Sequence, residues 1–255
     1  MKKDDFISML NLADNESALK LFDRFSLAEK TGKTVFSTDF YPPNVWARVI
    51  SSAESLRIPI EAFGAFQEAE RRMLAFNFDT NMDFPMILFK IINKSKFSQL
   101  THRDYLGVLM SLGIKREKLG DIVVSDNECY AVVFDELYSY IESSVKQIGK
   151  SPCSVVRLES FDDVPSINFE ESIIISTSMR CDSIVSAITR LSRAKGVELI
   201  NGGKVLVNYV DIREKDYEVE VLSTVTIKGY GKYKIYEVIG SSGSGRLKIR
   251  IKKFV

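Results

Sequence analysis

The sequence predicts an α+β protein built from three parts. We expect a mainly helical N-terminal domain over residues 1–84, a central βαββαβ domain over 85–160, a linker over 161–177, and a C-terminal domain of two helices on a small sheet over 178–255. Three observations support this division. The chain has 255 residues, 45% of them hydrophobic, which is enough for two or three ordinary cores. Helical and strand periodicities alternate along the middle of the chain. Basic residues are concentrated in the C-terminal part of the chain.

The first part reads mainly as helices. An amphipathic segment opens the chain, and helical periods of apolar residues recur over 45–53 and 62–76. A short strand is expected at 34–37, and the Tyr41-Pro42-Pro43 sequence marks a turn. The polar segment 79–84 is expected to connect this part to the next.

The second part alternates strands and helices in a recognisable order. Thr101 and Asp104 have the spacing of a capping box, Gly113 supplies a stop, and Asp126-Asn127 fits a tight turn between two strands. The order βαββαβ is typical of ferredoxin-like and RRM-like domains. Strands are expected at 86–92, 121–125, 129–134 and 154–158, with helices at about 104–112 and around the apolar face of Leu137, Ile141, Val145 and Ile148.

The last part begins with two short helices. Ile184, Ile188 and Leu191 are spaced as one helical face, Ser192 is a natural N-cap, and Gly202-Gly203 ends the second helix. An acidic polar stretch over 161–171 is expected to lead into this domain. Short strands are expected at 204–207, 217–222 and 224–228, followed by a hairpin of 234–239 with 247–253 across a Gly/Ser loop.

Charge is distributed unevenly along the chain. The segment 178–255 holds 15 Lys and Arg against 8 Asp and Glu, which leaves 20 basic and 26 acidic residues in 1–177. Such asymmetry indicates an anionic partner for the C-terminal part. Arg193 and Lys195 lie in the first turn after Ser192, where the helix dipole disfavours each cation by about 0.3–1 kcal/mol. Arg180 precedes the other helix in the same way. A phosphate at these helix starts would account for the cations; solvated surface charges are the alternative.

Several short motifs follow one another in this region: Arg180-Cys181-Asp182, Leu191-Ser192-Arg193, Glu198-Leu199-Ile200, Gly203-Lys204-Val205, Val207-Asn208 and the basic glycine turn Lys228-Gly229-Tyr230-Gly231-Lys232-Tyr233. Their spacing resembles the RNA-binding domain named after small-subunit ribosomal protein S-four. Tyr209 and Leu222-Ser223 depart from that pattern at turns where the family has glycine, so we expect a different backbone path there. The resemblance implies two helices on a small sheet, with a basic face that holds the RNA backbone.

Further motifs lie outside the last domain: Phe63-Gly64-Ala65-Phe66, Ala69-Glu70-Arg71, Thr101-His102-Arg103-Asp104-Tyr105-Leu106-Gly107, Leu112-Gly113-Ile114-Lys115-Arg116-Glu117-Lys118 and Gly120-Asp121-Ile122. These segments resemble the YlmH-type proteins, although Ala65 departs from the family's usual second glycine. The resemblance implies binding to the large ribosomal subunit and a role in rescuing subunits obstructed by peptidyl-tRNA.

The expected function is therefore non-catalytic binding of structured rRNA or tRNA on the large ribosomal subunit. Lys115 and Arg116 follow the first central helix and could extend a track for phosphates, or form a solvated turn. The strand over 130–134 lacks the full pattern of an RNA-stacking strand, so we expect it in the core. The expected RNA-binding residues are Arg180, Arg190, Arg193, Lys195, Lys204, Asn208, Lys228, Lys232, Lys115 and Arg116.

The patterns of common enzymes are incomplete. His102-Arg103-Asp104 lacks the companion motifs of a kinase, and Thr31-Gly32-Lys33-Thr34 lacks the earlier glycine of a phosphate loop, because Leu27 stands there. Cys129, Cys153 and Cys181 are too few and too widely spaced for a disulfide framework or a zinc knuckle, and are expected as buried thiols.

We therefore expect no cofactor, metal or small-molecule substrate, and a cytoplasmic monomer with neither a leader nor a membrane span. Two alternatives remain open. One is an RNA-modifying enzyme that uses His102, Asp104 or Asp121. The other is an interaction scaffold linked to cell division.

Overall fold

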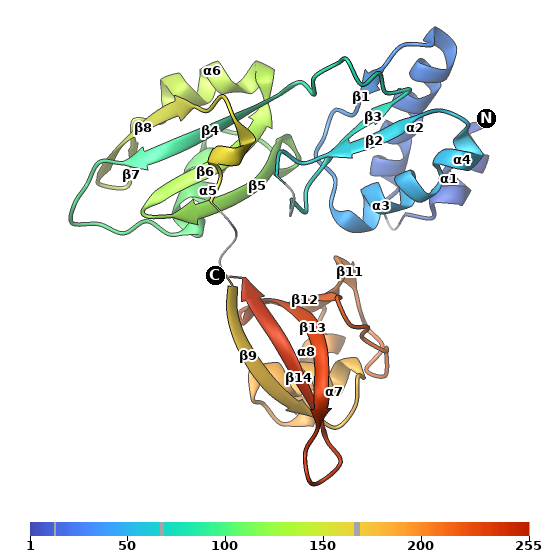
Figure 1. Ribbon diagram of the computed structural model, residues 1–255, viewed down its shortest axis with the longest axis vertical. Helices are drawn as coiled ribbons and strands as arrows, with labels where there is room; N and C mark the ends of the chain where they lie inside the picture. The colour runs from blue at the N-terminus through green and yellow to red at the C-terminus, as the bar shows by residue number, and fades with distance from the viewer. Residues whose placement is uncertain (13, 67–68, 166–168, 255) are drawn as a thin grey trace. The chain divides into compact units, whose positions relative to one another are not determined.

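The computed structural model describes residues 1–12, 14–66, 69–165 and 169–254, and the chain folds into two compact units, Met1–Ser166 and Ile167–Val255 (Figure 1). Both units combine helices with antiparallel sheets, so the α+β class is confirmed. No helix among the described residues is long and apolar enough to cross a membrane.

Helices and a small sheet form the beginning of the first unit. The sheet has the order β1-β3-β2, and its core includes Phe6, Phe25 and Phe76. The expected strand at 34–37 is confirmed as β1. The elements are α1 (Lys3–Leu10), α2 (Asn15–Thr31), β1 (Val35–Phe36), α3 (Pro43–Ser51), α4 (Ala53–Leu56), β2 (Ile60–Phe63) and β3 (Met73–Phe76).

The expected helix over 62–76 is wrong, because β2 and β3 pair there as antiparallel strands. Between them, Ala65 has a φ of 70°, which no helix contains. The chain also folds tightly on itself, since a Cβ on Gly64 would lie 2.5 Å from the Cβ of Ala69. Apolar residues spaced like a helical face therefore belong to two strands and the segment between them.

The rest of the first unit has the expected βαββαβ order. The Thr101 and Asp104 capping box is present, and both residues of the Asp126-Asn127 turn have positive φ. The sheet is antiparallel with the order β5-β6-β4-β8-β7. Its elements are β4 (Met86–Asn93), α5 (His102–Ser111), η1 (Arg116–Lys118), β5 (Leu119–Ser125), β6 (Glu128–Phe134), α6 (Asp135–Ser144), β7 (Gln147–Ile148) and β8 (Ser151–Arg157).

Both faces of this sheet are covered where β4 and β6 run side by side. Phe89 and Val133 pack in the core with Tyr105 of α5 and Ile141 of α6. On the other face, Leu88, Val132 and Phe134 pack with residues of the N-terminal part, among them Phe40 and Met73. The strand over 130–134 is therefore core, as expected.

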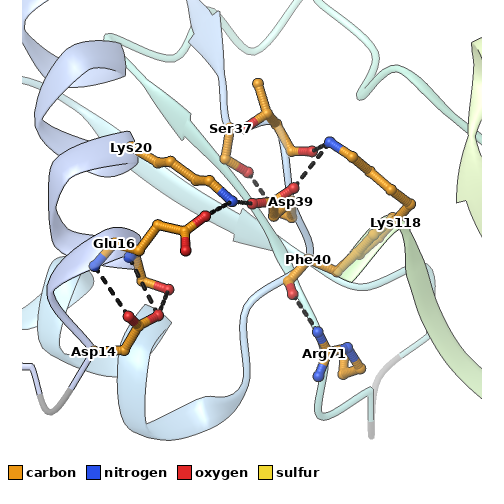
Figure 2. A network of polar contacts seen from close by, with 10 residues as sticks. Asp14, Glu16, Lys20, Ser37, Asp39, Phe40, Arg71 and Lys118 are labelled. Atoms are coloured by element: carbon orange, nitrogen blue, oxygen red, sulfur yellow. Dashed lines mark hydrogen bonds and ion pairs between the residues drawn. The ribbon is translucent and has the colours of Figure 1, made fainter. Parts of the chain in front are cut away.

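A buried carboxylate joins the two parts of the first unit (Figure 2). Asp39 accepts from Lys20 of α2 at 3.0 Å and from Lys118 of η1 at 2.9 Å. Lys118 also donates to the carbonyl of Thr38, and Arg71 donates to the carbonyl of Phe40 at 2.7 Å. The Lys20 ammonium donates hydrogen bonds to Glu16 and Asp39, and these bonds raise the pKa of the ammonium group. These bonds fix the N-terminal part against the loop before β5.

The second unit is a sheet of six strands with two helices. Its order is β11-β10-β12-β13-β14-β9, and Ile249 and Ile251 of β14 share a core with Ile184 and Ile200 of the helices. The two helices and the C-terminal hairpin are as expected. The elements are β9 (Phe169–Ser176), α7 (Cys181–Thr189), α8 (Arg193–Asn201), β10 (Val205–Val207), β11 (Val210–Asp211), β12 (Thr224–Ile227), β13 (Gly231–Ser241) and β14 (Leu247–Phe254).

Two expectations for this unit are wrong. The expected linker over 161–177 contains β9, which pairs with β14 along its whole length and forms an edge of the sheet; residues 166–168 of that linker lie outside the described residues. The segment 217–222 is not a strand. It hydrogen-bonds to the chain around the start of α7, through Cys181 N to Tyr217 O at 2.8 Å and Val219 N to Met179 O at 2.9 Å.

Candidate nucleic-acid interface

Arg180 and Arg193 share one buried carboxylate, that of Asp182. Asp182 lies in the first turn of α7, and its side chain is 3% exposed. Arg193, the first residue of α8, donates to its Oδ2 from Nε at 3.0 Å and from Nη2 at 2.8 Å. Arg180 contacts both oxygens at 3.3 Å. The guanidinium side chains stay accessible, at 35% for Arg180 and 56% for Arg193. One carboxylate thus orients two cations that face solvent.

The charge of this cluster follows from competing effects on Asp182. Burial raises the pKa of the carboxyl, but hydrogen bonds and charge from Arg180 and Arg193 outweigh it, so the pKa lies below its usual value. Asp182 is therefore ionised at neutral pH. The three side chains by themselves carry a net charge of +1, and N–H groups are left over because each guanidinium carries five. The hydrogen bond to Asp182, together with the charges of Asp182, Asp216 and Glu218, raises the pKa of Arg180.

Asp182 corrects the interpretation of the helix starts. From its sequence position, Arg193 was expected either to contact an external phosphate or to be a solvated surface charge, whereas Asp182 compensates its charge within the fold. Asp182 entered the sequence prediction only as part of a motif. The signal for its role was present, because it lies two residues after Arg180 and in the first turn of a helix, where acids are favoured. Lys195 remains exposed in the first turn of α8.

Other expected RNA-binding residues lie in a second group beyond the far end of α8. Lys228 N donates to Lys204 O at 2.8 Å, so these exposed lysines are neighbours on adjoining segments. The nine residues of α8 span roughly 13 Å between the two groups.

Arg190 is exposed at the end of α7, in the left-handed conformation, with a φ of 57°.

Asn208 and Lys232 are already engaged in the fold. The Asn208 side chain accepts from Thr224 N at 2.9 Å and donates to Ser223 Oγ at 3.3 Å, so it serves the turn before β11. The Lys232 ammonium lies 4.5 Å from the ring centre of Phe254 and 5.2 Å from that of Tyr209. Both side chains therefore have partners within the fold.

The turns that depart from the S-four pattern keep the left-handed backbone. Tyr209 has a φ of 66° and Leu222 a φ of 68°. The expectation of a different backbone path at these turns is therefore wrong. Side chains other than glycine adopt this conformation at a cost that the hydrogen bonds around Asn208 offset in part.

Lys115 and Arg116 belong to the first unit. Arg116 donates from Nη1 to the carbonyls of Leu119 at 2.8 Å and Gly120 at 2.9 Å, which holds the backbone entering β5. Lys115 is exposed. These two residues are therefore part of a different unit from the cations of α7 and α8.

The carboxylates considered for catalysis have structural partners. Asp104 accepts from the backbone N–H of Thr101 at 2.8 Å in the capping box. Asp121 accepts from the backbone N–H groups of Glu70 and Arg71 and so fixes that loop to β5. All three cysteines are buried and free, as expected. Within the described part of the chain, no three His, Cys, Asp or Glu side chains lie together as a metal site would require.

Comparisons with known proteins agree with the resemblance seen in the sequence. Residues 79–162 match the family described as "Putative RNA-binding domain in YlmH". The chain is 25% identical over 221 residues to "Ribosome-associated protein quality control protein P2" of Bacillus subtilis (strain 168), across 85% of this chain and 86% of that protein. Residues 79–162 thus match a domain of the YlmH-type proteins, and the chain is similar over most of its length to a protein named for ribosome-associated quality control.

A solved YlmH-type structure shares the fold. The "Cell division protein ylmH from Streptococcus pneumoniae" superposes with a TM-score of 0.51 and 22% identity, covering 60% of this chain and 96% of that one. At this identity the likeness is one of fold. The match to the YlmH domain and the relative from Bacillus subtilis together support RNA binding and association with the ribosome.

Proposed function

We propose that this protein is a non-catalytic factor of ribosome-associated quality control. It binds structured rRNA or tRNA on the large ribosomal subunit through the helix pair of its second unit and acts as a monomer in the cytoplasm. The proposal is supported by the match of residues 79–162 to the YlmH domain and by the name of the relative from Bacillus subtilis.

The cluster of Arg180, Asp182 and Arg193 is the observation that carries the proposal. Arginine binds phosphate oxygens through paired N–H groups, and a side chain held in place before binding loses less entropy than a free one. Asp182 holds both guanidinium groups at the starts of two helices. Lys195 adds an exposed cation in the first turn of α8. This arrangement is suited to the sugar-phosphate backbone of a folded RNA, whose recognition depends mainly on shape.

Binding of this kind depends strongly on salt. Each contacted phosphate releases counterions, so contact with about five phosphates gives a slope of about −3.5 to −4.5 for log affinity against log salt. A titration of purified large subunits from low to moderate salt measures the slope. A flat response would contradict binding through phosphates.

Neutralising the exposed cations tests the location of the interface. Arg193→Gln with Lys195→Gln removes two charges, while the amide introduced by the first change can still donate a hydrogen bond to Asp182. The matched control is Arg246→Gln with Lys248→Gln, which removes the same charge at the exposed end of the β13–β14 hairpin, where Lys248 pairs with outward-facing Ile175. We expect the first pair to weaken co-sedimentation with large subunits at least about tenfold, since several phosphate contacts are lost, and the control to weaken it far less.

Equal losses in the two pairs would locate the interface elsewhere or indicate a response to net charge alone. Thermal unfolding and circular dichroism of each variant show whether the second unit is intact.

A further inference from the structure

One aromatic side chain of the first unit stands entirely in solvent. Phe97 is 101% exposed, in the loop between β4 and α5. Lys94 and Lys96 precede it, are both exposed, and form no ion pair with any residue that the structure describes. Exposing an aromatic ring to water is unfavourable, so this loop differs from an ordinary solvated loop that carries only polar side chains.

Hydrogen bonds hold this loop in one conformation. The Asn93 amide donates to the carbonyl of Ser98 at 3.0 Å and accepts from Ser95 N at 2.9 Å. The Asn127 amide donates to the same Ser98 carbonyl at 3.0 Å and accepts from Leu100 N at 2.9 Å. Phe97 therefore lies on a segment fixed on both sides, and its exposure is built into the fold.

Further positive charge lies beside the loop. Lys94 N donates to Pro152 O at 2.9 Å, and the hydroxyls of Ser98 and Ser151 lie 2.6 Å apart. The loop thus adjoins the turn between β7 and β8, where Lys150 is exposed. The turn before β6 adds one exposed acid, Asp126. These adjoining segments therefore present three exposed lysines, Lys94, Lys96 and Lys150, and one exposed acid, Asp126.

The sheet face opposite the helices offers little room for RNA. Leu88, Val132 and Phe134 are buried with residues of the N-terminal part. Farther along the same strands, the Tyr130 hydroxyl donates to Glu128 at 2.8 Å, and Glu128 also pairs with Lys90 at 3.1 Å. An RNA contact by this part of the chain is therefore expected at a loop, and Phe97 is the aromatic residue presented there.

We propose that Phe97 stacks on an unpaired base of the bound RNA while Lys94, Lys96 and Lys150 contact the flanking phosphates. This inference rests on the proposed function and adds a second contact, in the part of the chain that matches the family's RNA-binding domain. Bases stack on aromatic rings without regard to sequence, and phosphates attract lysine, so the combination selects an exposed nucleotide in a loop or bulge.

Substitutions at position 97 separate stacking from mere contact. Phe97→Ala and Phe97→Leu remove the flat ring, whereas Phe97→Trp keeps one. Stacking of one base corresponds to about tenfold in affinity, so the first two variants bind purified large subunits about tenfold more weakly, and Phe97→Trp binds like the parent. The matched control is Tyr140→Leu, which removes a half-exposed ring from α6. Thermal unfolding stays unchanged, because the Phe97 side chain is fully exposed and its loss removes no buried surface.

A photo-crosslinker identifies the partner directly. Benzoylphenylalanine at position 97, irradiated with large subunits, is expected to crosslink to a nucleotide. Crosslinks to protein alone, or full affinity in Phe97→Ala, overturn the proposal. If Arg193→Gln with Lys195→Gln weakens binding and Phe97→Ala does not, only this inference fails. If neither change weakens binding, the proposed function fails as well.

Discussion

Arg193 Nε donates to Asp182 Oδ2 at 3.0 Å, which ties the first residue of α8 to the first turn of α7. Arg180 reaches the same carboxylate. A single acidic side chain therefore decides where two basic ones lie. Because the acid is 3% exposed and lies beneath the cations, its replacement is expected to change both binding and stability.

Asp182→Asn is expected to weaken RNA binding although it makes the protein more positive. The amide cannot hold two guanidinium groups, so the cations lose their fixed positions. Losing charge-assisted hydrogen bonds costs about 1.5–3 kcal/mol in the free energy of unfolding. Urea unfolding and co-sedimentation with large subunits measure the two effects. Tighter binding by Asp182→Asn would show that charge matters and position does not.

The contribution of Asp182 to stability is expected to depend on pH. Its pKa is lowered in the folded protein, so its contribution is complete above the unfolded value of about 3.9 and is lost as the pH falls through the folded value. The difference in unfolding free energy between the parent and Asp182→Asn should stay constant from pH 7 to pH 5. It should shrink below about pH 3.9. A difference that already declines between pH 7 and pH 5 would contradict a lowered pKa.

Gly196→Ala is expected to disturb the contact between α7 and α8. A Cβ at this position would lie 2.9 Å from Ser186 Oγ and 3.3 Å from Asp182 O. Arg193, one turn earlier, would shift away from Asp182. The matched control is Gly107→Ala in α5, where a Cβ meets nothing within 4 Å. Alanine there should stabilise the helix by about 0.8–1 kcal/mol, whereas Gly196→Ala should destabilise the second unit. Thermal unfolding of the two variants measures whether their stabilities change in these opposite directions.

Asp39→Ala is expected to loosen the first unit. The change leaves Lys20 and Lys118 without their shared buried acceptor, which costs about 1–3 kcal/mol. Hydrogen exchange should rise in peptides around residues 35–41 and 115–120 and stay unchanged in the second unit. The control is Glu16→Ala, which removes an exposed partner of the same Lys20 and should cost less than about 1 kcal/mol. Uniform exchange across the chain would contradict a local role for Asp39.

The sequence predicted secondary structure best where one face of an element is buried and the other face is exposed to solvent. The βαββαβ order, the capping box at Thr101 and the pair α7–α8 were all predicted. The strand β9 was missed because both of its faces carry apolar side chains: Ile174 is buried, while Ile173 and Ile175 are more than half exposed. Alternation, which normally marks a strand, is therefore absent.

The opposite error occurred in the segment 217–222. Its residues alternate like a strand, yet Tyr217 O and Val219 N bond to the chain around the start of α7, and Leu222 N donates to Ile235 O of β13. The alternation does not mark a buried face either, because Val219 is buried while Tyr217 and Val221 are exposed. Tertiary contacts decide which partners the backbone of this segment takes.

The positions of the candidate cations in the helices were predicted from the sequence, and their contacts within the fold were not. Sequence position placed Arg180, Arg193 and Lys195 at helix starts, where the structure has them. The role of Asp182 depends on a contact between two helices, and the engagement of Asn208 depends on residues 15 and 16 positions away. Such contacts leave no periodic signal. Phe97 could have been found as an aromatic residue between polar ones, but only its exposure distinguishes it.

The pairing of β9 with β14 places the two ends of the second unit next to each other. Phe169 opposes Phe254, with ring centres 5.0 Å apart, so the strand that opens the unit lies beside the strand that closes it. A module with adjacent ends can be inserted into another chain or circularly permuted with little strain. New ends opened in the exposed Gly/Ser loop between β13 and β14, with a short bridge between the old ones, would keep every strand pair of the sheet.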